Sequence, residues 1–479
     1  MRDAAALVPS LMLLLTGLAI ALAGASPRGK ETAPRASGAG LAALGVVFAA
    51  LACLRLWGHR FEAFGMVELD GFGLFLSLVV LAGLGLTLPV ARVALARQDL
   101  ERPEFYALLL LSATGMLLMV STRNLILLFV ALETMSLGVY ALSGWAHRRA
   151  DSVEASLKYF LYGAFASAFL LYGVALFYGL SGSVDLADIE ASLLSRRGGL
   201  GPLPVAALAL LLVGFGYKVA AAPFHMWAPD VYQGAPTVVT AFMAVAVKAA
   251  GFGVLLRATG WLGSLDGEWR ALVWVLAALS MTVGNLAAIA QEDIKRMLAY
   301  SSVAHAGYLL VGVVAGGESG RTAALYYLLA YTFMNFGAFA VAIALGREGD
   351  ENLAIRNWGG LGWRYPVPGV AMAIFMLSLT GLPPTAGFFG KFYLFSAAIQ
   401  EGFVGLVLVG VINTLVSAYY YLRVVRVLFL GQPIPDPGLP RPGLALSLPL
   451  LAAAAATLIL GLLPAPWLAL ARRAALEFF

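Results

Sequence analysis

The sequence predicts an all-α membrane protein of about 14 transmembrane helices. Of its 479 residues, 61% are hydrophobic and only 12% are charged, and the mean hydropathy is +0.87. Soluble globular domains carry about 25% charged residues. Apolar segments of roughly twenty residues recur from one end of the chain to the other, and each can cross about 30 Å of hydrocarbon. Lipid is therefore the expected surroundings of most outward side chains.

Short polar segments divide the chain into 14 predicted apolar spans. They are expected near 4–24, 37–57, 71–91, 104–120, 122–143, 155–180, 203–222, 237–256, 271–290, 300–315, 321–345, 367–400, 403–430 and 444–470. The segment 367–400 is too long for one straight helix, and Gly381, Pro383 and Pro384 interrupt its middle.

The first span has a second interpretation. Arg2 ahead of an apolar run that ends in small residues at 23–26 is also typical of a secretory signal peptide. Arg28, Lys30 and Arg35 follow the run and outnumber the charge before it. This favours an uncleaved helix with its N-terminus outside.

Lysine and arginine are distributed unequally between alternate loops. Odd loops hold 16 of the 31 basic residues, and even loops with both tails hold 11, among them Arg257 and Arg270. The odd loops are therefore predicted to be cytoplasmic, with both termini outside. Lys30 and Lys295 are interpreted as ordinary loop lysines. The four basic residues that remain are all lysines within or at the edge of a span: Lys158, Lys218, Lys248 and Lys391.

Lysines inside spans require an explanation, because each costs about 2.5–3.5 kcal/mol at a helix centre on insertion scales. Arginine stays protonated under any accessible condition, whereas a desolvated lysine ammonium releases its proton far more readily than in water. A chain that uses arginine in its loops and lysine in its spans is therefore predicted to move protons.

One carboxylate completes the predicted relay. Glu133 lies at the midpoint of 122–143, where an isolated carboxylate would simply take up a proton. Lys218 is its expected partner, and a change in their separation would push a proton onward. Lys248 lies near the midpoint of 237–256 with no polar residue within a turn. The alternative at each site is a buried ion pair that only stabilises the fold.

Two proline-rich interruptions accompany two of these lysines. Lys218 immediately precedes the first, and Lys391 follows the second. Pro223 and Pro383 are 160 residues apart, and paired broken spans are the sequence pointer to an inverted-repeat transporter. The freed backbone groups need water or neighbours, so the breaks are expected to line hydrated cavities. An ordinary kink is the alternative.

Other polar residues give weaker signals. Lys158 lies close to a span end and can extend to the surface, and His225 and His305 can either relay protons or cap helix ends. Cys53 has no partner, which excludes disulfides and thiolate metal sites within this chain. No metal site or bound cofactor is predicted. The net charge of +5 comes from scattered basic residues, so nucleic acid is not an expected partner.

Four phrases carry a resemblance to a known family. They are Ala-Ala-Pro-Phe-His-Met-Trp-Ala-Pro-Asp-Val-Tyr at 221–232, Ala-Phe-Met-Ala-Val-Ala-Val-Lys-Ala-Ala at 241–250, Glu-Asp-Ile-Lys-Arg-Met-Leu-Ala-Tyr-Ser-Ser-Val-Ala-His-Ala-Gly-Tyr at 292–308 and Gly-Leu-Pro-Pro-Thr-Ala-Gly-Phe-Phe-Gly-Lys-Phe at 381–392. The chain resembles the antiporter-like membrane subunits of respiratory complex I over roughly 100–430, and it looks most like subunit N.

The resemblance implies two inverted five-helix repeats, helices 4–8 and 9–13, with discontinuous helices 7 and 12. The corresponding units would be helices 1–3 at 1–100, the first repeat at 101–260, the second at 261–432 and helix 14 at 433–479. Glu133 and Lys218 match the pair of the first half-channel, Lys248 the connecting lysine and Lys391 the lysine of the second half-channel.

Subunits M and L fit less well. The resemblance implies a glutamate at the position of Lys391 in M and a long lateral helix beyond the bundle in L. The implied activity is that of a proton-translocating subunit of NADH:quinone oxidoreductase in the bacterial inner membrane, with other membrane-arm subunits as partners. Flavin (FMN), iron–sulfur clusters and quinone would belong to other subunits. A cation/proton antiporter subunit or a membrane-bound hydrogenase subunit is the alternative.

Overall fold

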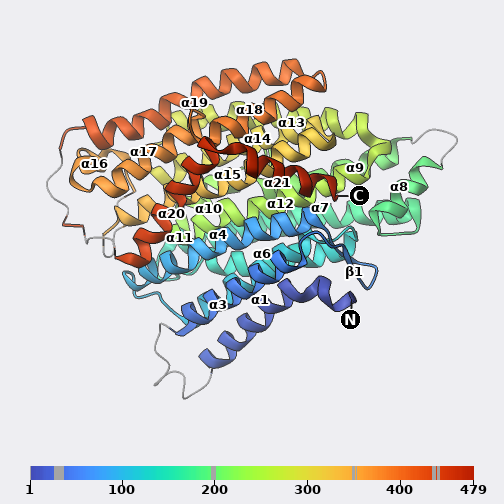
Figure 1. Ribbon diagram of the computed structural model, residues 1–479, viewed down its shortest axis with the longest axis horizontal. Coiled ribbons are helices and arrows are strands. Elements are labelled where there is room, and N and C mark those ends of the chain that lie inside the picture. The colour runs from blue at the N-terminus through green and yellow to red at the C-terminus, as the bar shows by residue number, and fades with distance from the viewer. Residues whose placement is uncertain are drawn as a thin grey trace.

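The computed structural model is an elongated bundle whose long helices run roughly parallel or antiparallel to one another (Figure 1). It describes residues 2–25, 37–195, 201–347, 351, 353–433, 438–439 and 443–478. Arg28, Lys30 and Arg35, on which the orientation of the first span depends, lie outside the described residues.

The helices follow the predicted spans closely. The first half contains α1 (Arg2–Ala25), α3 (Ser37–Leu56), α4 (Gly71–Ala96), α5 (Pro103–Val120), α6 (Leu125–Ser143), α7 (Ala150–Ser181), α8 (Leu186–Leu194), α9 (Pro202–Val219), α10 (Trp227–Gly234), α11 (Thr237–Phe242), the π-helix η1 (Met243–Val247) and α12 (Lys248–Trp261). A small antiparallel hairpin, β1 (Phe61–Ala63) and β2 (Val67–Leu69), joins α3 to α4.

The second half is also helical. It contains η2 (Gly263–Leu265), α13 (Asp266–Ile289), α14 (Ile294–Ala315), α15 (Gly317–Ala344), η3 (Ile355–Trp358), α16 (Leu361–Arg364), α17 (Pro366–Thr380), α18 (Ala386–Gln400), α19 (Val404–Leu430), α20 (Leu444–Leu462) and α21 (Pro464–Leu476). Within the described ranges, 13 helices are long and apolar enough to cross a membrane, and α17 is a shorter apolar helix. The prediction of about 14 spans is confirmed.

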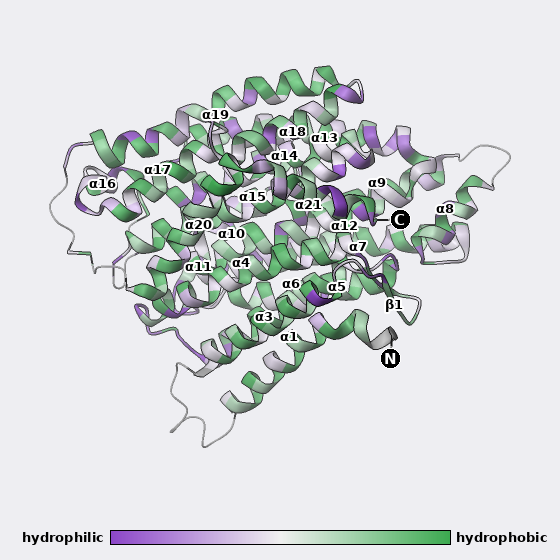
Figure 2. Cartoon of the chain, in the orientation of Figure 1, coloured by the Kyte–Doolittle hydropathy of each residue, from purple (hydrophilic) through white to green (hydrophobic). Residues whose placement is uncertain are grey.

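Burial separates an inner set of helices from an outer set. The most apolar stretch of the α11–α12 segment is 100% buried, and those of α14 and α15 are 94% and 89% buried. The corresponding value for α1 and for α3 is 33%, and both helices expose leucines. Hydrophobic residues cover the outer helices, while hydrophilic ones gather at the two ends of the bundle (Figure 2). An apolar outer surface of this extent fits a lipid environment.

Different segments of the chain lie at the two ends of the bundle. Both marked termini, the β1–β2 hairpin and α8 lie at one end (Figure 1). The turns from α4 to α5 and from α6 to α7 lie at the opposite end, because α4 and α6 each begin at the end that carries the termini. The basic residues of these two turns therefore lie at the same end of the bundle.

Both predicted helix breaks are present. The chain leaves α9 through Ala220 in the left-handed conformation (φ 57°) and resumes helix at α10. It leaves α17 through Gly381 (φ 91°) and resumes at α18. A further break was not predicted, since the expected span 444–470 divides into α20 and α21 before Pro464. Proline lacks a backbone N–H and so begins the second helix rather than continuing the first.

Arg257 does not lie in a loop, as the sequence suggested, but inside α12 with 1% of its surface exposed. Its guanidinium donates to both oxygens of Asp70, at 3.0 and 2.9 Å, and to the carbonyl of Val120 at 2.9 Å. Asp70 also caps α4 by accepting from the Gly73 backbone N–H at 2.7 Å. The pair ties α12 to the start of α4.

We expect Arg257→Leu to lower the free energy of unfolding by about 3–5 kcal/mol, because it leaves a buried carboxylate without its partner. The thermal unfolding midpoint of the purified protein in detergent measures this loss. Adding Asp70→Asn should recover part of it, since asparagine keeps the capping oxygen without the charge. A double variant as unstable as the single one would contradict this account.

Candidate functional site

Three predicted lysines lie deep in the bundle. Lys218, Lys248 and Lys391 are 4%, 2% and 4% exposed. They come from α9, α12 and α18, each within two turns of an interruption in regular α-helix. A buried ammonium needs compensating polar contacts. The partners of each lysine therefore decide what it can do.

Lys218 occupies the last turn of α9, directly before the first break. Its Nζ donates to the Ser136 hydroxyl at 2.7 Å and to the Tyr140 hydroxyl at 3.3 Å. The ammonium also lies 5.3 to 6.0 Å from the ring centres of Tyr140, Tyr159 and Tyr217. Aromatic faces attract a cation without holding it in one fixed geometry.

Glu133 is half-buried on α6, and the direct ion pair expected with Lys218 does not form. Its carboxylate accepts from the Ser167 hydroxyl of α7 at 2.5 Å. Ser136, which binds Lys218, lies three residues further along the same helix, so Glu133 and Ser136 are neighbours on α6. The structure therefore brings Glu133 and Lys218 into one polar region, in which each binds a different hydroxyl.

Lys248 begins α12 immediately after the π-helix η1. Its Nζ donates to the backbone carbonyl of Ser302 at 2.5 Å and lies 5.6 Å from the ring centre of Tyr331. A π-turn within a helix disturbs the regular backbone ladder and is common at functional sites. Lys248 is thus held by one carbonyl and one ring.

Lys391 lies on α18, one and a half turns beyond the second break. Its Nζ donates to the carbonyls of Leu379 and Thr380, at 3.1 and 3.0 Å. These carbonyls end α17, where the helix dipole places partial negative charge. The ring centre of Tyr308 lies 4.4 Å away. The broken helix therefore supplies the ligands of this ammonium.

His305 connects Lys248 to Lys391. Its ring lies 5.2 Å from the ring of Tyr331, which faces Lys248, and 5.6 Å from the ring of Tyr308, which faces Lys391. The imidazole is 1% exposed and sits in the middle of α14, so it does not cap a helix.

The two ring nitrogens of His305 contact hydroxyls. Nδ1 lies 2.5 Å from the Tyr327 hydroxyl and Nε2 lies 2.9 Å from the Tyr421 hydroxyl. A neutral imidazole accepts at one nitrogen and donates at the other. His305 can therefore donate to one of these hydroxyls and accept from the other.

Lys158 and His225 lie apart from this chain of residues. The Lys158 Nζ pairs with Glu154 and with Asp230, both at 2.7 Å, and its side chain is 36% exposed. Arg296 binds the other oxygen of Asp230 at 2.8 Å. His225 lies in the first break, with its ring centre 6.5 Å from that of Tyr300. The geometry of Lys158 favours a surface ion-pair network.

Lys295 was interpreted as an ordinary loop lysine, and that interpretation is wrong. It lies in the first turn of α14 with 0% of its surface exposed. Its Nζ donates to the Ala235 carbonyl at 2.6 Å and to Glu351 at 3.3 Å. In the sequence Lys295 stands among polar residues, as loop lysines do. In the structure the neighbouring segments cover its side chain.

Glu351 joins several segments at this end of the bundle. Its Oε1 accepts from the hydroxyl and the backbone N–H of Thr237, at 2.7 and 3.1 Å. Burial raises the pKa of the Glu351 carboxyl, but Lys295, Thr237 and Arg149 outweigh that effect and hold the pKa below its ordinary value. The carboxylate is therefore charged and fully engaged near neutral pH.

A set of buried tyrosines and asparagines also escaped the sequence-based prediction. The Asn285 amide donates to the Tyr308 hydroxyl and to Asn413, both at 3.3 Å, and accepts from the Tyr420 hydroxyl at 2.8 Å. This network extends from the Lys391 region to α13 and α19. The only signal in the sequence is the presence of polar groups within apolar spans, which does not distinguish a network from isolated side chains.

Comparisons with known proteins agree with this architecture. A family profile described as "NADH:quinone oxidoreductase/Mrp antiporter, TM" matches residues 122–417. NADH-quinone oxidoreductase subunit N of Trichlorobacter lovleyi is 42% identical, over 98% of this chain and 96% of that protein. NADH-quinone oxidoreductase subunit N 2 of Roseiflexus castenholzii is 45% identical, over 91% of this chain and 90% of that protein.

Solved structures show the same fold. A chain of respiratory complex I from Thermus thermophilus is 41% identical, with a TM-score of 0.83, and the match covers 96% of this chain and 98% of that one. A chain of the Mrp complex from Dietzia is 27% identical, with a TM-score of 0.82, over 99% and 97% of the two chains. The bundle with its two broken helices thus belongs to the NADH:quinone oxidoreductase/Mrp antiporter family of membrane proteins.

Proposed function

We propose that this chain is a proton-translocating membrane-arm subunit of an NADH-quinone oxidoreductase, of the subunit N type. The relatives at 42% and 45% identity carry that name over nearly their whole length. The Mrp chain shares only 27% of its residues, which favours the oxidoreductase over the cation antiporter. Flavin, iron–sulfur clusters and quinone would reside in other subunits, and quinone reduction there would drive proton movement here.

The continuous polar axis through the apolar bundle is the observation that carries this proposal. Ring contacts link Lys248 to His305 through Tyr331, and His305 to Lys391 through Tyr308. Glu133 and Lys218 form the cluster at the first break, and Gly251, one turn from Lys248, lies against the Lys218 backbone. Proton transfer needs such groups within hydrogen-bond reach of one another or of one bridging water.

Polar atoms without protein partners support a hydrated path beside Lys248. Both amide atoms of Asn335, one turn along α15 from Tyr331, are buried and make no hydrogen bond to a described residue. Buried polar groups are ordinarily satisfied by ordered water. Water at these atoms would extend the polar surroundings of Lys248 along α15.

The proposed orientation follows the basic residues. Turns at the end opposite the termini contain Arg97, Arg102, Arg148 and Arg149, which belong to the predicted odd loops. Those loops hold 16 basic residues against 11 in the even loops and tails, and this excess favours the cytoplasm. Both termini would then face the outside of a bacterial inner membrane. The division into repeats at 101–260 and 261–432 remains a prediction from the resemblance.

We expect Lys248→Ala to reduce proton pumping per NADH oxidised about tenfold or more, because the central titratable group is lost. Proton uptake by inverted membrane vesicles, measured against NADH consumption, gives this ratio. Lys158→Ala is the matched control, since it removes a lysine whose ion pairs are exposed. Equal pumping by the wild type and the Lys248 variant would refute the relay.

Lys391→Arg separates a proton relay from a structural cation. Arginine keeps a positive charge beside the Leu379 and Thr380 carbonyls but does not release its proton. We expect the variant to assemble normally and to pump about tenfold less, as measured by the same vesicle assay. Full pumping would show that Lys391 only neutralises the end of α17.

We expect His305→Phe to interrupt transfer between Lys248 and Lys391 while preserving an aromatic ring at that position. Pumping should fall about tenfold, with assembly of the complex judged by native gel electrophoresis. Tyr326→Phe is the control, because the Tyr326 hydroxyl binds the Leu460 carbonyl outside the relay. If both variants pump equally, His305 is not the connecting residue.

A further inference from the structure

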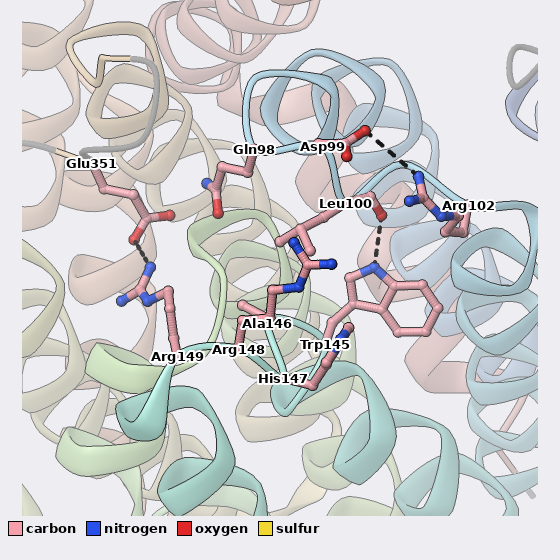
Figure 3. A pocket seen from close by; sticks show the side chains of 10 residues that line it. All are labelled: Gln98, Asp99, Leu100, Arg102, Trp145, Ala146, His147, Arg148, Arg149 and Glu351. Atoms are coloured by element: carbon pink, nitrogen blue, oxygen red, sulfur yellow. Dashed lines mark hydrogen bonds and ion pairs between the residues drawn. The ribbon is translucent and has the colours of Figure 1, made fainter.

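A cavity of ≈ 390 Å³ lies at the end of the bundle opposite the termini, away from the relay. It is formed by the turn 98–102 between α4 and α5, the turn 145–149 between α6 and α7, and Glu351 (Figure 3). The Trp145 indole N–H donates to the Leu100 carbonyl at 2.9 Å and so joins the two turns. The cavity is within the size range of small-molecule sites, about 300–1,000 Å³.

Three guanidinium groups line this cavity, and two of them have carboxylate partners. Arg149 binds Asp151 at 2.6 Å and lies 3.6 Å from Glu351. Arg102 lies 3.9 Å from Asp99, a long contact between exposed side chains. Exposed pairs of that kind contribute little energy. Arg102 is therefore available to a second anion.

Arg148 is the guanidinium without a partner. Within the described part of the chain it forms no hydrogen bond or ion pair, and its head group points toward Leu100 (Figure 3). Glu351 does not compensate it, because that carboxylate is engaged by Lys295 and Thr237. The cavity thus carries one uncompensated positive charge, with the imidazole of His147 nearby.

The position of the cavity indicates the kind of anion. It lies where α4 and α6 end and α5 and α7 begin, which is the level of lipid headgroups for a bundle that spans a bilayer. Tryptophan and arginine are typical of this interface. Planar guanidinium forks match phosphate oxygens closely, and basic pockets between membrane helices bind anionic headgroups.

We propose that this cavity binds a phosphodiester, with Arg148 and Arg102 as its ligands, and that the ligand is the headgroup of an anionic phospholipid. A phosphodiester carries one negative charge, which equals the uncompensated charge of the cavity. Arg149 and Trp145 form the fixed wall, because each is already held by a protein partner. The site is independent of the proton relay.

Native mass spectrometry of the purified complex that contains this chain tests the proposal. The delipidated complex is titrated in detergent with phosphatidylglycerol or with phosphatidylcholine, using the wild type, Arg148→Gln, and Arg102→Gln combined with Arg148→Gln. Arg356→Gln is the matched control, because it removes an exposed arginine from the same end of the bundle. Each variant is compared as assembled complex.

We expect the wild type and Arg356→Gln to bind one phosphatidylglycerol in preference to phosphatidylcholine. Arg148→Gln should weaken this binding about tenfold, and the double variant should weaken it further. Displacement of phosphatidylglycerol by millimolar inorganic phosphate would support Arg148 and Arg102 as the residues that bind the anion, with free phosphate as a second source of that anion.

Two results would overturn the proposal. One is phosphatidylglycerol bound equally by the wild type and by the double variant. The other is a carbodiimide cross-link between Arg148→Lys and a carboxylate of another subunit, because an acidic protein segment would then occupy the cavity.

Discussion

Three lysine ammonium groups deep in an apolar bundle are bound by neutral polar groups rather than by carboxylates. The packing of the inner helices provides these contacts. Lys218 contacts hydroxyls and rings, Lys248 a carbonyl and a ring, and Lys391 two carbonyls and a ring. Among the described residues, none of the three has an ion-pair partner. A carboxylate in contact would favour the charged form strongly, whereas neutral groups leave the charged and neutral forms closer in energy.

The second helix break provides two of these neutral groups. Carbonyls within a regular helix already accept a hydrogen bond from the helix backbone, whereas those at a helix end do not. The turn at Gly381 frees the carbonyls of Leu379 and Thr380, which then bind Lys391. The turn at Ala220 ends α9 directly after Lys218, and the π-helix η1 ends directly before Lys248. Each of the three deep lysines thus lies close to irregular backbone.

The contrast with Arg257 clarifies the role of the lysines. Arg257 is equally buried, but Asp70 binds it through two hydrogen bonds and the rings of Phe72 and Phe478 cover it. Such a pair fixes the contact between α12 and α4. The same bundle therefore uses arginine with a carboxylate where it needs a permanent tie, and lysine with neutral ligands along the proposed path.

The sequence alone determined the membrane class, the approximate spans, both helix breaks and the identity of the three deep lysines, because apolar length, proline chemistry and the cost of a buried charge are local properties. The sequence-based prediction misplaced Arg257 and Lys295. A basic residue with polar neighbours in the sequence is typical of a loop, and only the packing of the helices shows that these two are buried. Tertiary structure decided the partners: Glu133 and Lys218 each bind a different serine hydroxyl, and His305 lies between Lys248 and Lys391. Those contacts join helices far apart in the chain, and no local pattern specifies how such helices pack.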